Sequence, residues 1–151
     1  MSRPAPKRPA KRPGKTRQRL NSLNQRDRIV GPASLVLLVS FWLPWYSIGP
    51  FSVDGLSAHG WLFIALVNAA VLVLYVLIIA FDVGDLAGPG RMSKDQLLAV
   101  LTGVNLALVG LAFLLKPASL SWAWGAFLAL IAAIAAFVPY GVPVIRDRLQ
   151  R

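Results

Sequence analysis

The sequence contains no cysteine, no glutamate and a single histidine, His59. The absence of cysteine excludes disulfides, thiolate metal ligands and cysteine nucleophiles. One histidine cannot form a histidine-rich metal site, and the loop around it, with Asp54 and several serines, shows no pattern of nucleophile, base and orienting group. We therefore expect no catalytic site, no metal site and no cofactor, and we predict that the protein is not an enzyme.

Charged side chains are also scarce through most of the chain. Of the 151 residues, 56% are hydrophobic, a high fraction for a soluble domain of this length. This composition predicts a membrane protein. Only seven charged residues lie between positions 29 and 145, all outside the long apolar runs: Asp54, Asp82, Asp85, Arg91, Lys94, Asp95 and Lys116.

Four apolar runs free of charge divide the chain. At about 1.5 Å per residue in a helix, runs of this length come close to a hydrocarbon core of roughly 30 Å. We therefore predict an all-α fold, a four-helix transmembrane bundle within residues 29–145. The predicted spans cover residues 29–46, 61–81, 97–115 and 122–140.

Local signals mark the ends of some spans. Ser93 followed by Gln96 is the pattern of a capping box, which predicts a helix start just before the third run. Pro139 and Pro143 should bend or fray the last turns of the fourth span. The first run follows a basic segment, as in a signal peptide, but it ends in bulky aromatic residues rather than a small-residue cleavage site.

The predicted spans sort the basic residues. Fifteen of the sixteen Lys and Arg residues fall on one side, in the segment before the first span, in the second loop and in the basic C-terminus at residues 146–151. Only Lys116 falls on the other side. Since cytoplasmic loops retain Lys and Arg, we predict a multi-pass plasma-membrane protein with both termini in the cytoplasm.

The tryptophans follow the same sorting. All five map to the outer ends of the first, second and fourth spans, and Trp prefers the headgroup region of a bilayer. We therefore predict an interfacial belt rather than an aromatic ligand cage. The belt would consist of Trp42, Trp45, Trp61, Trp122 and Trp124.

Polar side chains inside the apolar runs are candidates for contacts between helices, because such groups usually face the bundle interior. These candidates are Ser40, Asn68, Tyr75, Thr102 and Asn105. Counting about 1.5 Å per residue from the span ends predicts that Tyr75 contacts Thr102 and Asn105. The same count places Asn68 beside Ser40. Such hydrogen bonds would hold the helices together; the alternative is that these groups line a substrate path.

Small residues line one side of two spans, where they would let helix backbones approach closely. They fit contacts within the bundle and contacts between copies equally well, so a homo-oligomer stays open. The two sets are Gly103, Ala107 and Gly110 in the third span and Ala126, Ala129, Ala133 and Ala136 in the fourth.

Residues 1–28 combine Pro, Lys and Arg with almost no apolar content. Such a segment cannot bury enough surface to offset its ordering entropy, so we predict a disordered cytoplasmic tail. Its basic residues suit anionic lipid headgroups or a cytosolic protein partner, and nucleic acid is the weaker alternative. The residues concerned are Lys7, Arg8, Lys11, Arg12, Lys15, Arg17 and Arg19.

The first apolar run carries the sequence LPWY at residues 43–46, and a short polar loop then leads to Gly60 and Trp61. In these features the chain resembles small four-span membrane proteins of actinobacteria, of uncharacterised function, whose first span ends in an LPWY-type motif. The resemblance implies a location in a bacterial inner membrane and no activity. Four-span drug exporters have a similar size, but they depend on a first-span Glu that this chain lacks.

These features predict a non-enzymatic membrane component that acts as an accessory, assembly or anchoring protein. Its expected partners are the lipid bilayer, anionic headgroups and a membrane or cytosolic protein. The alternative is a small oligomeric transporter or channel subunit with a polar path between the second and third spans.

Overall fold

The computed structural model describes residues 25–81 and 93–150, and this part of the chain is mostly helical. The tail residues from Lys7 to Arg19 that were predicted to contact lipid or a partner lie outside the described residues. Three helices are long and apolar enough to cross a membrane: α4 (Leu62–Phe81), α5 (Lys94–Leu114) and α6 (Trp124–Leu149). Two shorter helices are α2 (Gln25–Ser40), with 16 residues, and α3 (Gly55–Ala58).

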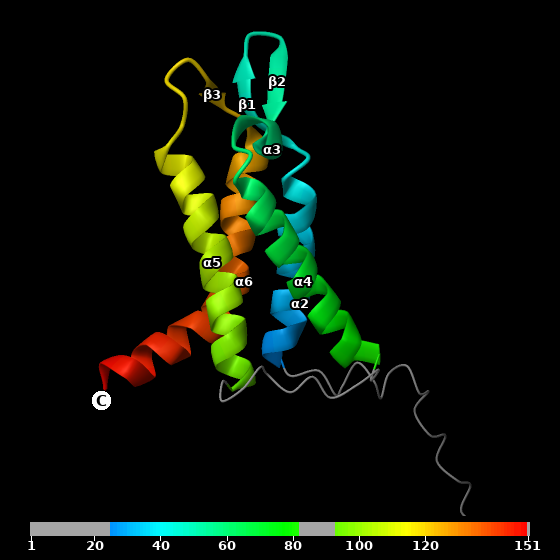
Figure 1. Cartoon of the computed structure of the whole chain (residues 1–151), viewed down its shortest axis with the longest axis vertical. Helices are drawn as coiled ribbons and strands as arrows, with labels where there is room; N and C mark the ends of the chain where they lie inside the picture. The colour runs from blue at the N-terminus through cyan, green and yellow to red at the C-terminus, as the bar shows by residue number, and fades with distance from the viewer. Residues whose placement is uncertain (1–24, 82–92, 151) are drawn as a thin grey trace, which may run out of the picture.

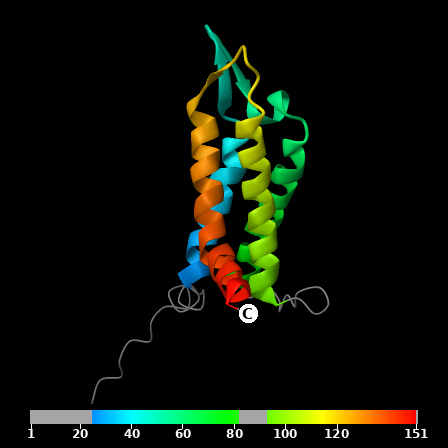
Figure 2. The same ribbon diagram turned by 90° about the vertical axis from the view of Figure 1, so that its left-hand side faces the viewer.

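The four longer helices stand side by side and alternate in direction (Figures 1 and 2). α2 and α5 begin at the same end of the bundle at which α4 and α6 finish. We call this the charged end, because it holds all but one of the described Lys and Arg residues: Arg26, Arg28, Lys94, Arg146 and Arg148. The opposite end, the sheet end, carries Lys116.

A small antiparallel sheet caps the bundle, so the prediction of an all-α fold is wrong at this end. Its strand order is β2-β1-β3, with β1 (Pro44–Ile48) in the centre, β2 (Phe51–Asp54) on one side and β3 (Ser121–Trp122) on the other. Gly49, with φ 54°, takes the first place of the two-residue turn between β1 and β2, where tight hairpins require a positive φ. The hairpin stands beyond the helix ends (Figure 1).

The helix α2 is displaced along the chain from the predicted first span over residues 29–46. It starts at Gln25, inside the segment predicted to be a tail, and ends at Ser40. The helix cannot run on to position 46, because a residue that precedes a proline, here Leu43, avoids the helical conformation. Pro44 then opens β1, which pairs with strands on both sides.

The start of α5 confirms the predicted capping box. The Ser93 hydroxyl accepts a hydrogen bond from the Gln96 N–H at 3.3 Å, and the Gln96 side chain accepts one from the Ser93 N–H at 3.2 Å. The helix therefore begins at Lys94, one turn earlier than the predicted span over residues 97–115.

The helix α6 bends at its prolines but does not end there. It runs through Pro139 and Pro143 to Leu149, whereas the predicted span stopped at residue 140. Each proline lacks the N–H that would bond to the carbonyl one turn earlier, which weakens the helix at that point. The last part of α6 turns aside from the bundle in Figure 1 and points towards the viewer in Figure 2, as the predicted bend requires.

Small residues set the packing between α2 and α6. The predicted small face of α6 is buried, at Ala126, Ala129, Ala133 and Ala136. It meets α2, whose buried positions recur at heptad spacing from Asp27 through Val30 and Ser34 to Leu37. The small set on α5 lies largely outside the core, because Ala107 is exposed and a Cβ added at Gly110 would meet no atom within 4 Å.

Candidate functional site

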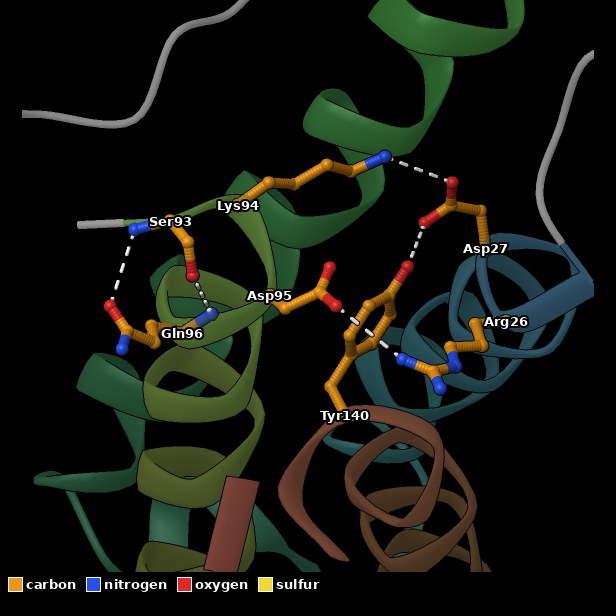
Figure 3. Close-up of polar contacts among 7 residues, drawn as sticks. All are labelled: Arg26, Asp27, Ser93, Lys94, Asp95, Gln96 and Tyr140. Carbon is orange, nitrogen blue, oxygen red and sulfur yellow. Dashed lines mark hydrogen bonds and ion pairs between the residues drawn. The ribbon is translucent and has the colours of Figure 1, made fainter. Parts of the chain in front are cut away.

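A cluster of charged and tyrosine side chains joins the helices at the charged end (Figure 3). Its centre is Asp27 in the first turn of α2, which is only 1% exposed. One carboxylate oxygen accepts a hydrogen bond from the Tyr140 hydroxyl, and the other pairs with the Lys94 ammonium at 3.0 Å. Three helices, α2, α5 and α6, therefore meet on a single carboxylate.

A second layer of charge covers this centre. Arg26 pairs with Asp95 at 3.4 Å, and both side chains are about half exposed. The Arg26 guanidinium also lies 5.9 Å from the centre of the Tyr140 ring, while the Lys94 ammonium lies 5.9 Å from the centre of the Tyr75 ring on α4. The exposed Arg26–Asp95 pair is worth about 0–1 kcal/mol. Breaking a fully buried pair costs about 3–5 kcal/mol, and the Lys94–Asp27 pair lies below that range because Lys94 is 39% exposed. The stabilising part of the cluster is therefore the buried one.

Sequence reasoning missed this cluster because it assigned Asp27 to the tail. Two signals could have found it. An acidic residue is favoured in the first turn of a helix, where it faces the positive end of the helix dipole. In addition, Asp27 lies seven residues before Ser34, so it continues the buried heptad of α2 towards the N-terminus.

The predicted polar residues Asn68 and Asn105 contact each other in the interior of the bundle. The Asn68 side-chain amide donates to the Asn105 side-chain oxygen at 3.0 Å and to the Leu101 carbonyl at 2.7 Å. Asn105 is fully buried, and within the described residues its own amide nitrogen has no hydrogen-bond partner. The pair links the third of α4 nearest the sheet end to the middle of α5.

In the described part of the chain Tyr75 makes no hydrogen bond to Thr102 or Asn105, so the hydrogen bonds predicted between them are wrong. The Thr102 hydroxyl donates to its own helix, to the Leu98 carbonyl at 2.7 Å. The error comes from the start of α5, because counting from residue 97 instead of Lys94 places every residue of that helix one turn too close to the charged end. Asn105 consequently lies level with Asn68.

The predicted contact between Asn68 and Ser40 is also wrong. The Ser40 hydroxyl donates to the Leu37 carbonyl of its own helix at 2.6 Å. Since α2 ends at Ser40, this residue lies at the sheet end of the bundle, whereas Asn68 lies six residues, or about 9 Å, inside α4.

The five tryptophans do not form one class. Trp45 is fully buried, its indole N–H donates to the Ser40 carbonyl at 2.8 Å, and its ring stacks on Phe41, so its assignment to an interfacial belt is wrong. Trp122 is half-buried and stacks on Phe113 with ring centres 4.3 Å apart. Trp61 is also half-buried, whereas the outward-facing members are Trp42 and Trp124. For the four tryptophans other than Trp45, the interfacial belt stays a prediction.

Tyr46 and His59 form a second polar contact, at the sheet end. The Tyr46 hydroxyl lies 3.0 Å from His59 Nε2 and donates to the Ala112 carbonyl at 3.2 Å. A hydroxyl has one hydrogen, so the His59 nitrogen must be the donor in their contact. Burial lowers the pKa of His59 below its ordinary value, which favours the neutral ring, and burial raises the pKa of Tyr46.

Two hollows flank the bent end of α6 at the charged end. A polar hollow of about 680 Å³ lies between α6 and the starts of α2 and α5, and Arg26, Asp95 and Asp147 line it. A groove of about 460 Å³ lies between α6 and the first turns of α5, and most of its lining is apolar. Arg148 lines both.

Comparison with protein-family models, with curated proteins and with solved structures finds no match to this chain.

Proposed function

We propose that the chain is a four-span component of a bacterial inner membrane that acts as an accessory, assembly or anchoring protein and catalyses no reaction. α2 is the fourth span, because it packs against α4 and α6 and turns apolar side chains outward at Leu35, Val36 and Val39. The charged end faces the cytoplasm, since Lys and Arg gather there. We also propose that the chain is related to the small actinobacterial membrane proteins that it resembles.

One observation carries the accessory role: apart from Ser34, the buried polar side chains of the described helices form hydrogen bonds within the bundle. Asp27 is held by Lys94 and Tyr140, and the Asn68 amide is held by α5. Hydrogen bonds of this kind fix helices against one another and are worth about 0.6–2 kcal/mol each in a membrane. A bundle tied in this way suits a fixed anchor that presents its basic tail to anionic lipid or to a cytosolic partner.

Deletion of residues 2–24 tests the accessory role, because the deletion stops before α2 begins at Gln25. We expect the shortened chain to remain in the membrane fraction and to lose the proteins that co-purify with the full chain from native membranes. A matched variant that replaces all eight Lys and Arg residues of positions 2–24 by Gln separates charge from length. Unchanged co-purification in both variants would contradict a role for the tail.

A small transporter is the second candidate, and two observations favour it. Asp27 is an ionisable side chain buried among the helices, as ion-driven transporters generally require. Within the described residues, the Ser34 hydroxyl and the Asn105 amide nitrogen are buried without partners. Reconstituted vesicles with an internal pH dye would show a proton flux when a membrane potential is imposed. Asp27→Asn should remove this flux. A flux equal to that of empty vesicles eliminates proton transport by this bundle.

A further inference from the structure

We propose that the groove between the start of α5 and the bent end of α6 binds one anionic phospholipid, whose phosphate contacts Arg148. This inference rests on the proposed membrane location, in which the charged end lies at a headgroup layer. It goes beyond the general attraction of a basic tail to anionic lipid, because it assigns a bounded site in the folded part of the chain.

The groove has the size and lining of a ligand site. Its volume of about 460 Å³ lies within the range of roughly 300–1,000 Å³ typical of small-molecule pockets. Ala99 and Val100 of α5 form one wall, and Phe137, Gly141 and Ile145 of α6 form the other. The acyl chain and glycerol of a phospholipid would cover these apolar side chains.

The bend of α6 and a glycine together open this groove. Past Pro139 the helix leaves the direction of the bundle and runs at an angle to α5 (Figure 1), and the groove lies between these two parts of the chain. Gly141 gives room to the Phe137 ring, because a Cβ at position 141 would lie 2.1 Å from that ring.

The polar groups of the groove lie where a headgroup would be. Gln96, in the first turn of α5, and Arg148, near the end of α6, are its polar lining residues. Val100 lies four residues, or about 6 Å, farther into the bundle than Gln96. The lining therefore changes from polar to apolar in the direction in which a phospholipid changes from phosphate to acyl chain.

Charge complementarity favours an anionic lipid. In the described part of the chain, no ion pair or hydrogen bond engages the Arg148 guanidinium. Of the acidic groups near it, Asp95 is paired with Arg26, and Asp147 lines the neighbouring polar hollow but not the groove. The guanidinium is therefore open to a phosphate, which it can bind through two parallel hydrogen bonds.

Native mass spectrometry of the full chain in a neutral detergent tests the proposal, with phosphatidylglycerol and phosphatidylcholine of the same acyl chains as probes. We expect one phosphatidylglycerol to be retained in preference to phosphatidylcholine. Arg148→Gln should weaken its binding at least roughly tenfold, because the charged hydrogen bonds to the phosphate are lost. Arg146→Gln is the matched control, because Arg146 lies in the same segment but does not line the groove, and it should change binding less than about twofold.

A second pair of variants tests the apolar wall. Val100→Trp places a large ring in the groove and should abolish retention, whereas Val104→Trp changes an equally outward residue one turn away that does not line the groove. An excess of glycerol phosphate should not displace the lipid, because it lacks acyl chains. Equal loss with Arg146→Gln and Arg148→Gln, or retention unaffected by Val100→Trp, overturns the proposal. Absence of the chain from the membrane fraction of cells would instead overturn the proposed function.

Discussion

The carboxylate of Asp27 depends on two donors from two other helices. A buried acceptor that loses one hydrogen bond without gaining water costs about 1–3 kcal/mol. We therefore predict that Tyr140→Phe lowers the free energy of unfolding by about that amount. Thermal unfolding in detergent, followed by circular dichroism, measures the change.

Tyr75→Phe is the control for this prediction. Tyr75 lies at the same end of the bundle, but its contact with Lys94 is made by the ring, which phenylalanine retains. The unfolding temperature should therefore stay close to that of the parent chain. Equal losses in the two variants would mean that the Tyr140 hydroxyl has no special role at Asp27.

The burial of His59 should make the stability of the folded chain depend on pH. Its pKa is lower in the folded chain than in the unfolded chain, because burial disfavours the charged ring. As the pH falls below the ordinary value of about 6.5, the unfolded chain therefore binds more protons than the folded one, and stability is lost. We predict a falling unfolding temperature between about pH 7 and pH 5.

His59→Gln should flatten that pH profile, because His59 is the single histidine of the chain. The nearby Asp54 does not titrate in this range. Burial raises its pKa, but hydrogen bonds from the Ser57 N–H and hydroxyl outweigh that effect and lower the pKa overall. A profile that keeps its slope in His59→Gln would contradict the assignment.

Individual polar residues could be selected from the sequence, but their partners could not. Asn68 and Asn105 were both chosen as interior groups, and they do contact each other. Their pairing was missed because a side chain's depth depends on where its helix begins, and one turn of error changes its neighbour. Hydroxyl side chains such as Ser40 and Thr102 add a second difficulty, since they bond to their own helix as readily as to another.

Among the elements, the start of α6 packs closely against the backbone of β1. A Cβ at Gly125 would lie 2.6 Å from the Pro44 carbonyl oxygen and 2.9 Å from the Leu43 side chain. We therefore predict that Gly125→Ala lowers the free energy of unfolding by about 1–3 kcal/mol, as overpacking does elsewhere. Thermal unfolding in detergent is again the measurement.

Gly110→Ala is the matched substitution inside α5. A Cβ at Gly110 meets no atom within 4 Å, so the change should be neutral or stabilise the helix by about 0.5–1 kcal/mol. Destabilisation by both substitutions to the same degree would show that contact with Leu43 and Pro44 is not the cause.

Elements with strong local signals were predicted well. The apolar run at residues 61–81 corresponds to α4, and the capping box at Ser93 marks the start of α5. The sheet could not be predicted in this way, because β1 is held by pairing with β2 and with the distant β3. The start of α2 could not be predicted for a related reason. The residues around Asp27 are basic, as in the tail, and the partners of Asp27, Lys94 and Tyr140, lie on distant helices.

For the whole molecule, the proposed orientation can be tested with single cysteines, since the chain has none of its own. We predict that Ser52→Cys, in the exposed β2, reacts with a membrane-impermeant maleimide on intact cells. Gln150→Cys, just past α6, should react only after the membrane is permeabilised. The opposite labelling pattern would place the charged end outside the cell and refute the orientation.

The unequal lengths of the helices have a consequence for the surrounding bilayer. The 16 residues of α2 extend about 24 Å and the 20 residues of α4 about 30 Å, while a hydrocarbon core is roughly 30 Å thick. In the proposed four-span arrangement, α2 therefore falls about 6 Å short of the hydrocarbon core, whereas α4 matches it. Lipids beside α2 would then thin to match that helix, so we expect the protein to be more stable in thin bilayers and to deform the surrounding lipid mainly on the side of α2.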